Sequence, residues 1–222
     1  MKKIIFKSIL FILISIIAVF LIIVLLGYLD YRKAIKVISI EDKIKTIQSD
    51  ENYIKSEDMS EEFKAAIVAV EDHRFYNHSG IDFWATGHAM YVNIFSGSFD
   101  YGASGISQQV GRLLYFTQEK SVIRKFSELF VAFNLEKNYS KNEILELYVN
   151  LAYYGKGYYG IGEASIGFFG KVPGELTKEE AAYLAGLPNA PSIYSVNGEL
   201  GEERKQQVLN AMEKYADEIY EK

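Results

Sequence analysis

Apolar positions divide the chain into an uninterrupted N-terminal block and a longer region with helical periodicity. Residues 8–28, SILFILISIIAVFLIIVLLGY, contain no charged side chain. At a rise of about 1.5 Å per residue, a helix of this length spans about 30 Å, the thickness of the hydrocarbon layer of a bilayer. Beyond it, apolar residues recur at helical spacing without strand-like alternation. The pattern predicts one N-terminal transmembrane helix followed by a mainly α domain.

The residues that flank the apolar block indicate how it is used. Lys2, Lys3 and Lys7 precede it, and the positive-inside rule then places the N-terminus in the cytoplasm and the rest of the chain outside. A cleaved signal peptide is the alternative, but it has a shorter apolar core followed by small residues at the cleavage site. Gly27-Tyr28-Leu29-Asp30 stands here instead. We therefore expect residues 1–33 to form a cytoplasmic tip and an uncleaved anchor.

Charge and cysteine content exclude several functions for the chain after the anchor. Residues 34–58 are expected to form a charged stalk with short extended pieces, and residues 59–222 the functional domain. Residues 34–222 carry 19 basic and 28 acidic side chains, a net charge of −9, which argues against a nucleic-acid-binding surface. The chain has no cysteine, so disulfides, thiolate catalysis and cysteine zinc sites are excluded.

Capping residues and apolar stripes locate the helices of the domain. Ser60 is a candidate N-cap for a helix with a buried stripe of Phe63, Ile67 and Val70, and this helix ends at Glu71. Residues 121–138 show a second stripe, whose members are Val122, Phe126, Leu129 and Phe133. The capping boxes Ser140-Lys-Asn-Glu143 and Thr177-Lys-Glu-Glu180 start two further helices, and a last one begins at about Glu202.

The stretch VEDHRFYNHSGID, residues 70–82, concentrates polar chemistry. His73 and His78 are five residues apart, so they do not share a helix face, and no HExxH motif occurs. A zinc site is therefore not expected. The remaining alternatives are a catalytic loop around Glu71 and Asp72, or a helix end with solvated charges.

A second polar region follows at residues 102–112, GASGISQQVGR. Its small residues allow a ligand to approach the backbone, and Gln108, Gln109 and Arg112 supply hydrogen-bond donors. Lys120, Arg124 and Lys125 then lead to Glu128, a set that suits an anionic substrate if the fold brings it together. The simpler alternative for Arg124 and Glu128 is an i,i+4 surface pair worth about 0.3–0.5 kcal/mol.

Five motif regions in order resemble the peptidoglycan glycosyltransferases, which include the transglycosylase module of class A penicillin-binding proteins and monofunctional cell-wall polymerases. The matching residues are Glu71, Asp72, Phe75, His78, Gly80 and Asp82; Gly102, Ser104, Gln108 and Gln109; Arg124 to Tyr148; Gly155, Gly157, Gly160 and Phe169-Gly-Lys171; and Glu180 to Pro188. The chain departs from the family at Gly105 and Ser107, where threonines are usual. Glycine at residue 105 lacks the threonine hydroxyl, which is worth about one hydrogen bond. We therefore expect at most about a tenfold effect on rate from this change.

The resemblance implies a lysozyme-like helical domain with a smaller membrane-apposed lobe. The aromatic residues 83–101 are the candidate for that lobe, and ordinary core is the alternative. Family members polymerise lipid II into β-1,4-linked glycan and release undecaprenyl diphosphate. The expected partners are lipid II, the growing glycan strand, the lipid bilayer and other cell-wall synthesis proteins. The expected location is the bacterial cell membrane, with a single span and the catalytic domain outside.

Site roles follow from the resemblance residue by residue. Glu71 is the expected general base, and Glu128 the second catalytic acid, which holds cations or a bridging metal near the diphosphate. No cofactor is required, although a divalent cation such as Mg or Mn is compatible with these residues. The expected substrate-binding residues are Asp72, Phe75, His78, Ser104, Gln108, Gln109, Arg112, Lys120, Arg124 and Lys125.

Two rival functions remain open at this point. The chain contains no Ser-x-x-Lys and no Lys-Thr-Gly, so the expectation is a monofunctional polymerase without a transpeptidase domain, insensitive to β-lactams. A lysozyme-like hydrolase also uses two carboxylates across a cleft, but it needs no cation cluster. An inactive membrane-anchored scaffold of cell-wall synthesis is the non-enzymatic rival, and the Gly105 departure is its only support.

Overall fold

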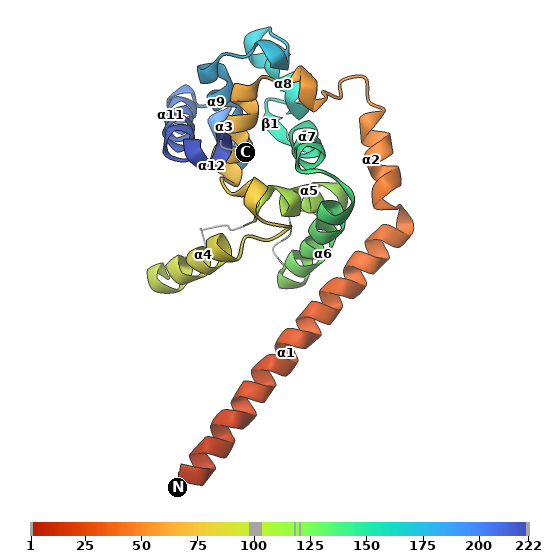
Figure 1. Cartoon of the computed structure of the whole chain (residues 1–222), viewed down its shortest axis with the longest axis vertical. Helices are drawn as coiled ribbons and strands as arrows, with labels where there is room; N and C mark the ends of the chain where they lie inside the picture. The colour runs from red at the N-terminus through yellow and green to blue at the C-terminus, as the bar shows by residue number, and fades with distance from the viewer. Residues whose placement is uncertain (1, 98–103, 118, 120, 221–222) are drawn as a thin grey trace.

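The computed structural model describes residues 2–97, 104–117, 119 and 121–220, and it is almost entirely helical (Figure 1). The mainly α class predicted from the sequence is confirmed. The only sheet in the described residues is a small antiparallel hairpin. The helices and strands are α1 (Lys2–Val37), α2 (Ile40–Gln48), α3 (Glu61–Glu71), α4 (Phe83–Ser96), α5 (Ile106–Tyr115), α6 (Val122–Asn138), α7 (Lys141–Leu151), β1 (Tyr153–Gly155), β2 (Tyr158–Tyr159), α8 (Gly160–Phe169), α9 (Lys178–Gly186), α10 (Pro191–Tyr194), α11 (Gly198–Lys214) and α12 (Ala216–Tyr220), with short 3₁₀ turns at Ser56–Asp58, Phe75–Asn77, Pro173–Glu175 and Leu187–Asn189.

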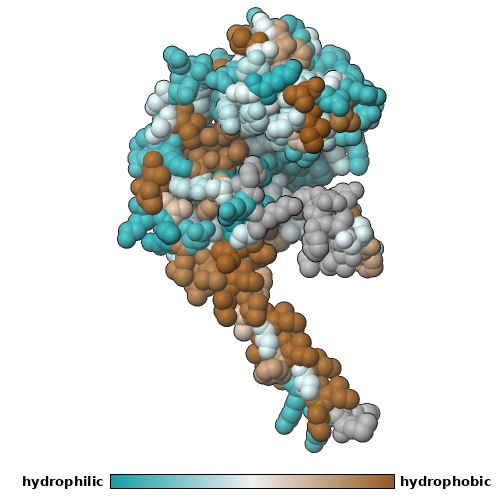
Figure 2. All heavy atoms as spheres, turned by 180° about the vertical axis from the view of Figure 1, so that it is seen from behind, coloured by the Kyte–Doolittle hydropathy of each residue, from teal (hydrophilic) through white to brown (hydrophobic). Residues whose placement is uncertain are grey.

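Helix α1 extends far beyond the body and is long and apolar enough to cross a membrane (Figures 1 and 2). Its C-terminal part packs against α6. A Cβ added at Gly27 would lie 2.5 Å from the Cβ of Phe126, so glycine allows the two helices to touch. Edge-to-face contacts join Phe20 to Phe126 and Tyr28 to Phe130, with ring centroids 5.7 and 5.3 Å apart. The apolar helix is therefore attached to the body by direct side-chain packing.

The structure corrects the expectation that residues 34–58 contain short extended pieces. Most of this segment is helical and packed. Helix α1 continues to Val37, and α2 follows after a two-residue elbow. Ile40 and Ile44 are 6% and 2% exposed, and Ile47 packs beside them. These isoleucines are spaced three and four residues apart, so Glu41, Asp42 and Lys45 face solvent, whereas Lys43 lies against Tyr115 of α5. The domain boundary expected at residue 59 stays a prediction.

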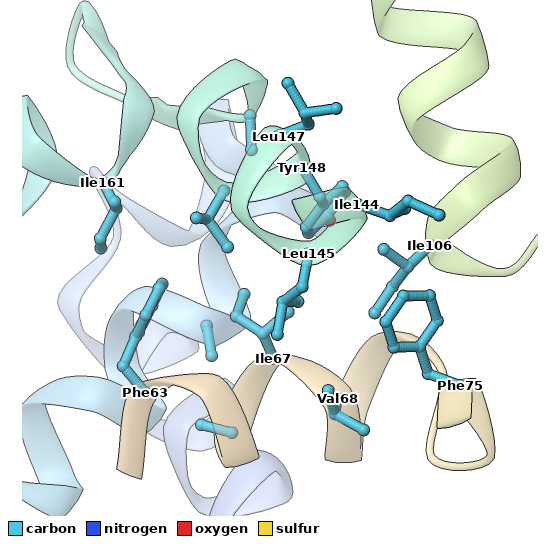
Figure 3. Close-up of a cluster of buried hydrophobic side chains, with 14 of the residues drawn as sticks. Phe63, Ile67, Val68, Phe75, Ile106, Ile144, Leu145, Leu147, Tyr148 and Ile161 are labelled. Atoms are coloured by element: carbon cyan, nitrogen blue, oxygen red, sulfur yellow. The ribbon is translucent and has the colours of Figure 1, made fainter. Parts of the chain in front are cut away.

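The core of the body lies between α3, α5, α7 and α9. Figure 3 shows large side chains of α3, α5 and α7 meeting, and Phe63, Ile67 and Tyr148 are at most 1% exposed. Ser60 caps α3 as predicted, with its hydroxyl 3.2 Å from the amide of Phe63. Both predicted capping boxes are also present, at the starts of α7 and α9. The fold thus holds the C-terminal end of α3, which carries Glu71, in a fixed place.

The apolar stripe predicted for residues 121–138 is partly wrong. Val122 and Phe133 are 63% and 43% exposed, whereas the buried face of α6 includes Glu128, Val131 and Leu135. The reason is that α6 is covered on two sides, by α5 and by the apolar helix α1. A helix that packs against two partners buries residues on two faces, so it lacks the single apolar stripe of a surface helix.

Helix α4 carries the aromatic stretch expected to form the smaller lobe, and it projects from the body in Figure 1. Its large side chains are not core: Phe83, Trp84, Tyr91 and Phe95 are 60–80% exposed. The alternative of ordinary core is therefore wrong for these four residues. Residues 98–101, the end of the predicted lobe, lie outside the described residues.

Candidate functional site

A cleft of about 550 Å³ opens beside the C-terminal end of α3, and Glu71 lines it. Residues from four other segments contribute to its walls: Gln109 and Arg112 from α5, Lys125 from α6, Tyr148 from α7, and Tyr153 from β1. The polar groups that the sequence placed in separate motifs are therefore brought together at one cavity. A cavity of about 600 Å³ between α2 and the end of α6 offers less chemistry, because its charged residues Glu41 and Lys45 pair with each other at 2.6 Å.

The carboxyl group of Glu71 is surrounded by protein although the residue keeps partial access to the cleft. The side-chain amide of Gln109 donates a hydrogen bond to it at 2.7 Å, and the hydroxyl of Tyr148 donates another. Burial raises the pKa of Glu71, and the Gln109 hydrogen bond and the charges of Arg204 and Arg112 oppose this rise. A carboxyl group with a raised pKa that faces a cleft is the usual property of a general base or acid.

Two cations also line the cleft. Arg112 lines it, and its Nε atom is buried without a hydrogen-bond partner. Within the described part of the chain Arg112 forms no ion pair with any carboxylate. Lys125 also lines the cleft, and burial together with the charges of Arg124 and Arg112 lowers its pKa to about 8. Two cations are thus held close together without full neutralisation, which favours an anionic ligand.

Glu128 lies behind these cations and does not line the cleft. Its side chain is fully buried and forms an ion pair with Arg124, and it accepts from Lys125 at 3.2 Å. The amide of Gln108 lies 3.3 Å from the same carboxylate. The surface-pair alternative for Arg124 and Glu128 is therefore wrong, because a surface pair is solvated. Both carboxylate oxygens are occupied by protein cations, so the geometry assigns Glu128 to holding the cations in place.

Ser104 joins this cluster, whereas Gln108 lies beneath it. The hydroxyl of Ser104 accepts a hydrogen bond from Lys125 at 2.7 Å, and Ser104 lines the cleft. Gln108 is 7% exposed and is absent from the cleft wall. Lys120, which the sequence also placed in this group, lies outside the described residues.

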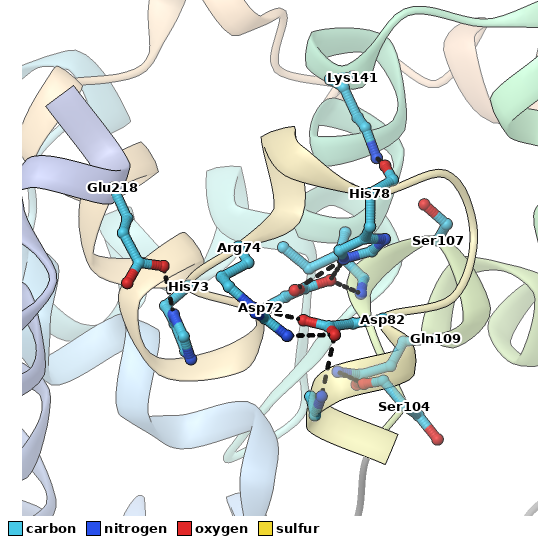
Figure 4. A network of polar contacts seen from close by, with 12 residues as sticks. Asp72, His73, Arg74, His78, Asp82, Ser104, Ser107, Gln109, Lys141 and Glu218 are labelled. Atoms are coloured by element: carbon cyan, nitrogen blue, oxygen red, sulfur yellow. Dashed lines mark hydrogen bonds and ion pairs between the residues drawn. The ribbon is translucent and has the colours of Figure 1, made fainter. Parts of the chain in front are cut away.

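Three residues expected to bind substrate instead form a polar network and core next to the cleft (Figure 4). His78 Nε2 lies 3.0 Å from both carboxylate oxygens of Asp72, and the backbone amide of Ile106 donates to Asp72 at 3.1 Å. Asp72 and His78 have side chains 6% and 9% exposed, and Phe75 is completely buried. The network thus connects the end of α3 to the start of α5, and Asp72 caps that helix because Gly105 has no side chain to do so.

The network also bears on metal binding. Ligand atoms of Asp72, His78 and Asp82 lie within 4.8 Å of one another, the spacing of a cation site. However, Arg74 forms a bidentate ion pair with Asp82, and Asp72 is occupied by His78 and the α5 amide. An arginine at this position opposes a second cation. The group is better explained as a structural network.

Some residues in or near the cleft were not predicted from the sequence. Tyr148 belongs to the third motif, but its helical spacing from Ile144 and Leu145 predicted only a buried core residue. Arg204 of α11 acts on Glu71 through its charge, but it lies in a polar helix with no motif. Pro188, the last residue of the fifth motif, and Asn189 line the cleft from the turn after α9, and neither was expected there because their place depends on the tertiary fold.

A buried acid and two incompletely neutralised cations in one cleft suit acid–base chemistry on an anionic substrate. Comparison with known proteins gives the family. Residues 40–213 match the transglycosylase family, and the chain belongs to it.

Curated relatives are similar to this chain over the same region. Penicillin-binding protein 1A of Neisseria lactamica is 44% identical over 162 residues, which are 72% of this chain and 20% of that protein. Penicillin-binding protein 1A of Neisseria flavescens is 43% identical over the same length, and penicillin-binding protein 1F of Bacillus subtilis is 41% identical over 157 residues, 70% of this chain and 22% of that protein. The chain spans about a fifth of the length of these relatives. The match begins at residue 40, so it includes α2.

Proposed function

We propose that the chain is a peptidoglycan glycosyltransferase that polymerises lipid II into β-1,4-linked glycan strands. The observation that carries the proposal is the placement of Glu71, with its raised pKa, in the same cleft as Arg112 and Lys125. Membership of the transglycosylase family supports transfer of a glycosyl group. The cation pair supports a substrate whose leaving group is a diphosphate.

The proposed reaction is a single displacement at the anomeric carbon of the donor sugar. The 4-hydroxyl oxygen of the acceptor attacks this carbon, and its proton passes to the Glu71 carboxylate. The new C1–O4 bond forms as the bond from C1 to the diphosphate oxygen breaks, and the configuration changes from α to β. General-base help of this kind contributes about 10²–10⁴ in rate when the pKa lies near the working pH.

The leaving undecaprenyl diphosphate carries the electron pair of the broken bond. Arg112 and Lys125 are the groups placed to stabilise this growing negative charge, the electrostatic contribution that is often the largest in catalysis. Glu128 and Ser104 keep Lys125 in position. These side chains supply the base and the positive charge that the reaction needs. A divalent cation bound by the diphosphate would further stabilise the negative charge on the leaving group.

Two helices, α1 and α4, would interact with the membrane. Helix α1 would anchor the chain with Lys2, Lys3 and Lys7 in the cytoplasm, and the body would lie outside. The exposed aromatic side chains of α4 suit the interfacial layer of the outer leaflet, because aromatic residues concentrate there. An anchored enzyme then meets its lipid-linked substrate by diffusion within the membrane. Other cell-wall synthesis proteins are proposed partners on the same surface.

Transpeptidation is outside the proposal. The 222 residues contain no Ser-x-x-Lys and no Lys-Thr-Gly, so this chain offers no acylation site for a β-lactam. Glycan synthesis by the chain should therefore continue in the presence of these drugs. A hydrolase is the weaker alternative, because it makes no use of Arg112 and Lys125.

Incubation of the purified protein with labelled lipid II tests the proposal. We expect long glycan products that a muramidase digests to disaccharide units, formed equally with and without a β-lactam. Cleavage of preformed glycan without synthesis would identify the hydrolase. A protein that binds a lipid-linked diphosphate but makes no glycan, under conditions in which a known transglycosylase works, would identify the scaffold.

A further inference from the structure

Three cationic side chains lie on α1 just beyond its apolar stretch. Arg32, Lys33 and Lys36 are exposed, and none of them forms an ion pair with a carboxylate in the described part of the chain. The acidic residue of the same helix, Asp30, accepts a hydrogen bond from the hydroxyl of Ser127 in α6 at 2.9 Å. We call Arg32, Lys33 and Lys36 the basic face, and its charge is available to a ligand from outside the protein.

The basic face points away from the body. Gly27 and Tyr31 are buried against α6, and the ring of Tyr31 stacks on that of Phe130 with centroids 5.9 Å apart. At about 100° per residue, the three cations lie roughly opposite this buried side of α1. The residues that line the catalytic cleft include Lys125 of α6 but none from α1. A ligand of the basic face is therefore separate from the substrate in the cleft.

The same side of α1 is apolar closer to the N-terminus. Leu25 and Leu29 are 55% and 54% exposed, and their spacing of four residues continues to Arg32 and Lys36 by steps of three and four. Figure 2 shows the apolar surface of α1 reaching the body. One side of the helix thus changes from leucine to cation between residues 29 and 32, as expected where lipid tails give way to headgroups.

The height of the basic face matches the headgroup layer. The charge-free stretch ends at Tyr28, so at about 1.5 Å per residue Arg32 and Lys33 lie about 6–8 Å beyond the hydrocarbon. The polar layer of each leaflet is about 5–8 Å thick. Lys36 lies about 12 Å beyond the hydrocarbon, and its long side chain can extend back towards the phosphates. Two of the three cations are therefore level with lipid phosphates.

The chemistry of this position fits a lipid with a net negative charge. Each Lys or Arg near an anionic membrane surface strengthens binding by about fivefold. A zwitterionic headgroup gains less, because its own cation repels the basic face. Residues 34–222 carry 19 basic and 28 acidic side chains, so the body itself is repelled by an anionic surface. The basic face supplies an attraction at the point where the body meets the membrane. An acidic protein fits less well, because lipid covers this side of α1 up to Leu29.

We propose that the basic face binds the headgroups of anionic phospholipids and gathers these lipids around the end of α1 that joins the body. The inference rests on α1 spanning a bilayer, which is part of the proposed function. It depends neither on glycosyl transfer nor on the side of the membrane that the body occupies.

The test measures which lipid lies beside α1 when the full-length protein is in nanodiscs. The chain has no cysteine, so Leu25→Cys gives a single site for a fluorescent label on the lipid-facing side of α1. Brominated phosphatidylglycerol and brominated phosphatidylcholine are compared as quenchers at equal mole fraction. We expect phosphatidylglycerol to be preferred by about fivefold, since each exchange brings one headgroup to the basic face.

Variants of the basic face should remove this preference. The triple change Arg32→Gln, Lys33→Gln and Lys36→Gln should bring the quenching ratio of the two lipids to about one. The double change Lys33→Gln and Lys36→Gln keeps the 3.0 Å hydrogen bond from Arg32 to the hydroxyl of Tyr28, and it should give an intermediate ratio. Circular dichroism should show equal folding, because the three side chains are exposed.

The matched control removes three exposed lysines outside α1, by Lys55→Gln, Lys156→Gln and Lys178→Gln, and it should keep the wild-type ratio. Equal quenching by both lipids in wild type, an unchanged ratio in the triple variant or an equal loss in the control overturns the proposal. In these cases the anchor still stands, and the basic face is left to a soluble anion or an acidic protein. No quenching by either lipid would refute the membrane span and the lipid site together. A lipid preference that depends on the basic face, in a protein that polymerises no lipid II, supports the lipid site while the proposed function fails.

Discussion

Replacing Glu71 by glutamine should abolish most activity and at the same time stabilise the protein. The amide keeps the shape of the carboxyl group and can still accept the 2.7 Å hydrogen bond from Gln109. It cannot take a proton from the acceptor hydroxyl. We expect polymerisation at saturating lipid II to fall by about 10²–10⁴, the contribution of a general base.

The stability change follows from the raised pKa of Glu71, which burial causes. In the unfolded chain the group ionises near the ordinary glutamate pKa of 4.5, whereas burial raises the pKa in the folded protein, which retains the proton to a higher pH. Between these two values rising pH favours the unfolded state, so the wild type loses stability across this window and then levels off. Glu71→Gln lacks that loss and should be more stable at neutral pH by about 0.5–2 kcal/mol, as is common when an active-site acid is neutralised.

Two measurements check this reasoning. Lipid II turnover gives the rate, and urea unfolding at pH 4 and pH 8 gives the free energy of unfolding. The difference in stability between variant and wild type should be small at pH 4 and larger at pH 8. Glu61→Gln, at the exposed first turn of the same helix, is the control and should change neither rate nor pH dependence. Near-normal turnover by Glu71→Gln would refute Glu71 as the base, and an equal stability difference at both pH values would refute the burial argument.

Four further changes test other parts of the structure. Activity should decline above about pH 8 as Lys125 loses its proton, and Lys125→Arg should move this limb of the pH–rate profile to higher pH, which initial rates will show. Glu128→Ala leaves buried cations without their carboxylate and should lower the free energy of unfolding by about 3–5 kcal/mol in urea titrations, with little activity left. Gly27→Leu forces α1 away from Phe126 and should lower the melting temperature of the full-length protein in detergent. Gly105→Thr should lower the free energy of unfolding by about 1–3 kcal/mol, measured in the same way.

The helices that carry the site could be predicted from local signals. Ser60 as an N-cap and the stripe of Phe63 and Ile67 place Glu71 at a helix end, and the structure agrees. Such signals work because capping and burial of one face act within a few residues along the chain. The capping boxes of α7 and α9 were predictable for the same reason.

Elements with two partners were not predictable in this way. Helix α6 buries Glu128 and exposes Phe133, because α1 and α5 cover it from different sides. Helix α2 looked like a stalk because its buried isoleucines are separated by charges. The influence of Arg204 on Glu71 depends on α11 packing against α3 and α9, which no local pattern reports.

Gly105 shows why a departure from a family motif has to be judged together with its spatial neighbours. From the sequence, the missing hydroxyl looked like the loss of one hydrogen bond. In the structure a Cβ at residue 105 would lie 2.5 Å from Oδ2 of Asp72, the oxygen that accepts from the amide of Ile106. Asp72 thus does the capping that a side chain at residue 105 would otherwise do, and it occupies the space that such a side chain needs. Restoring the threonine displaces a buried carboxylate from its hydrogen bonds, so the glycine stabilises this chain as it stands.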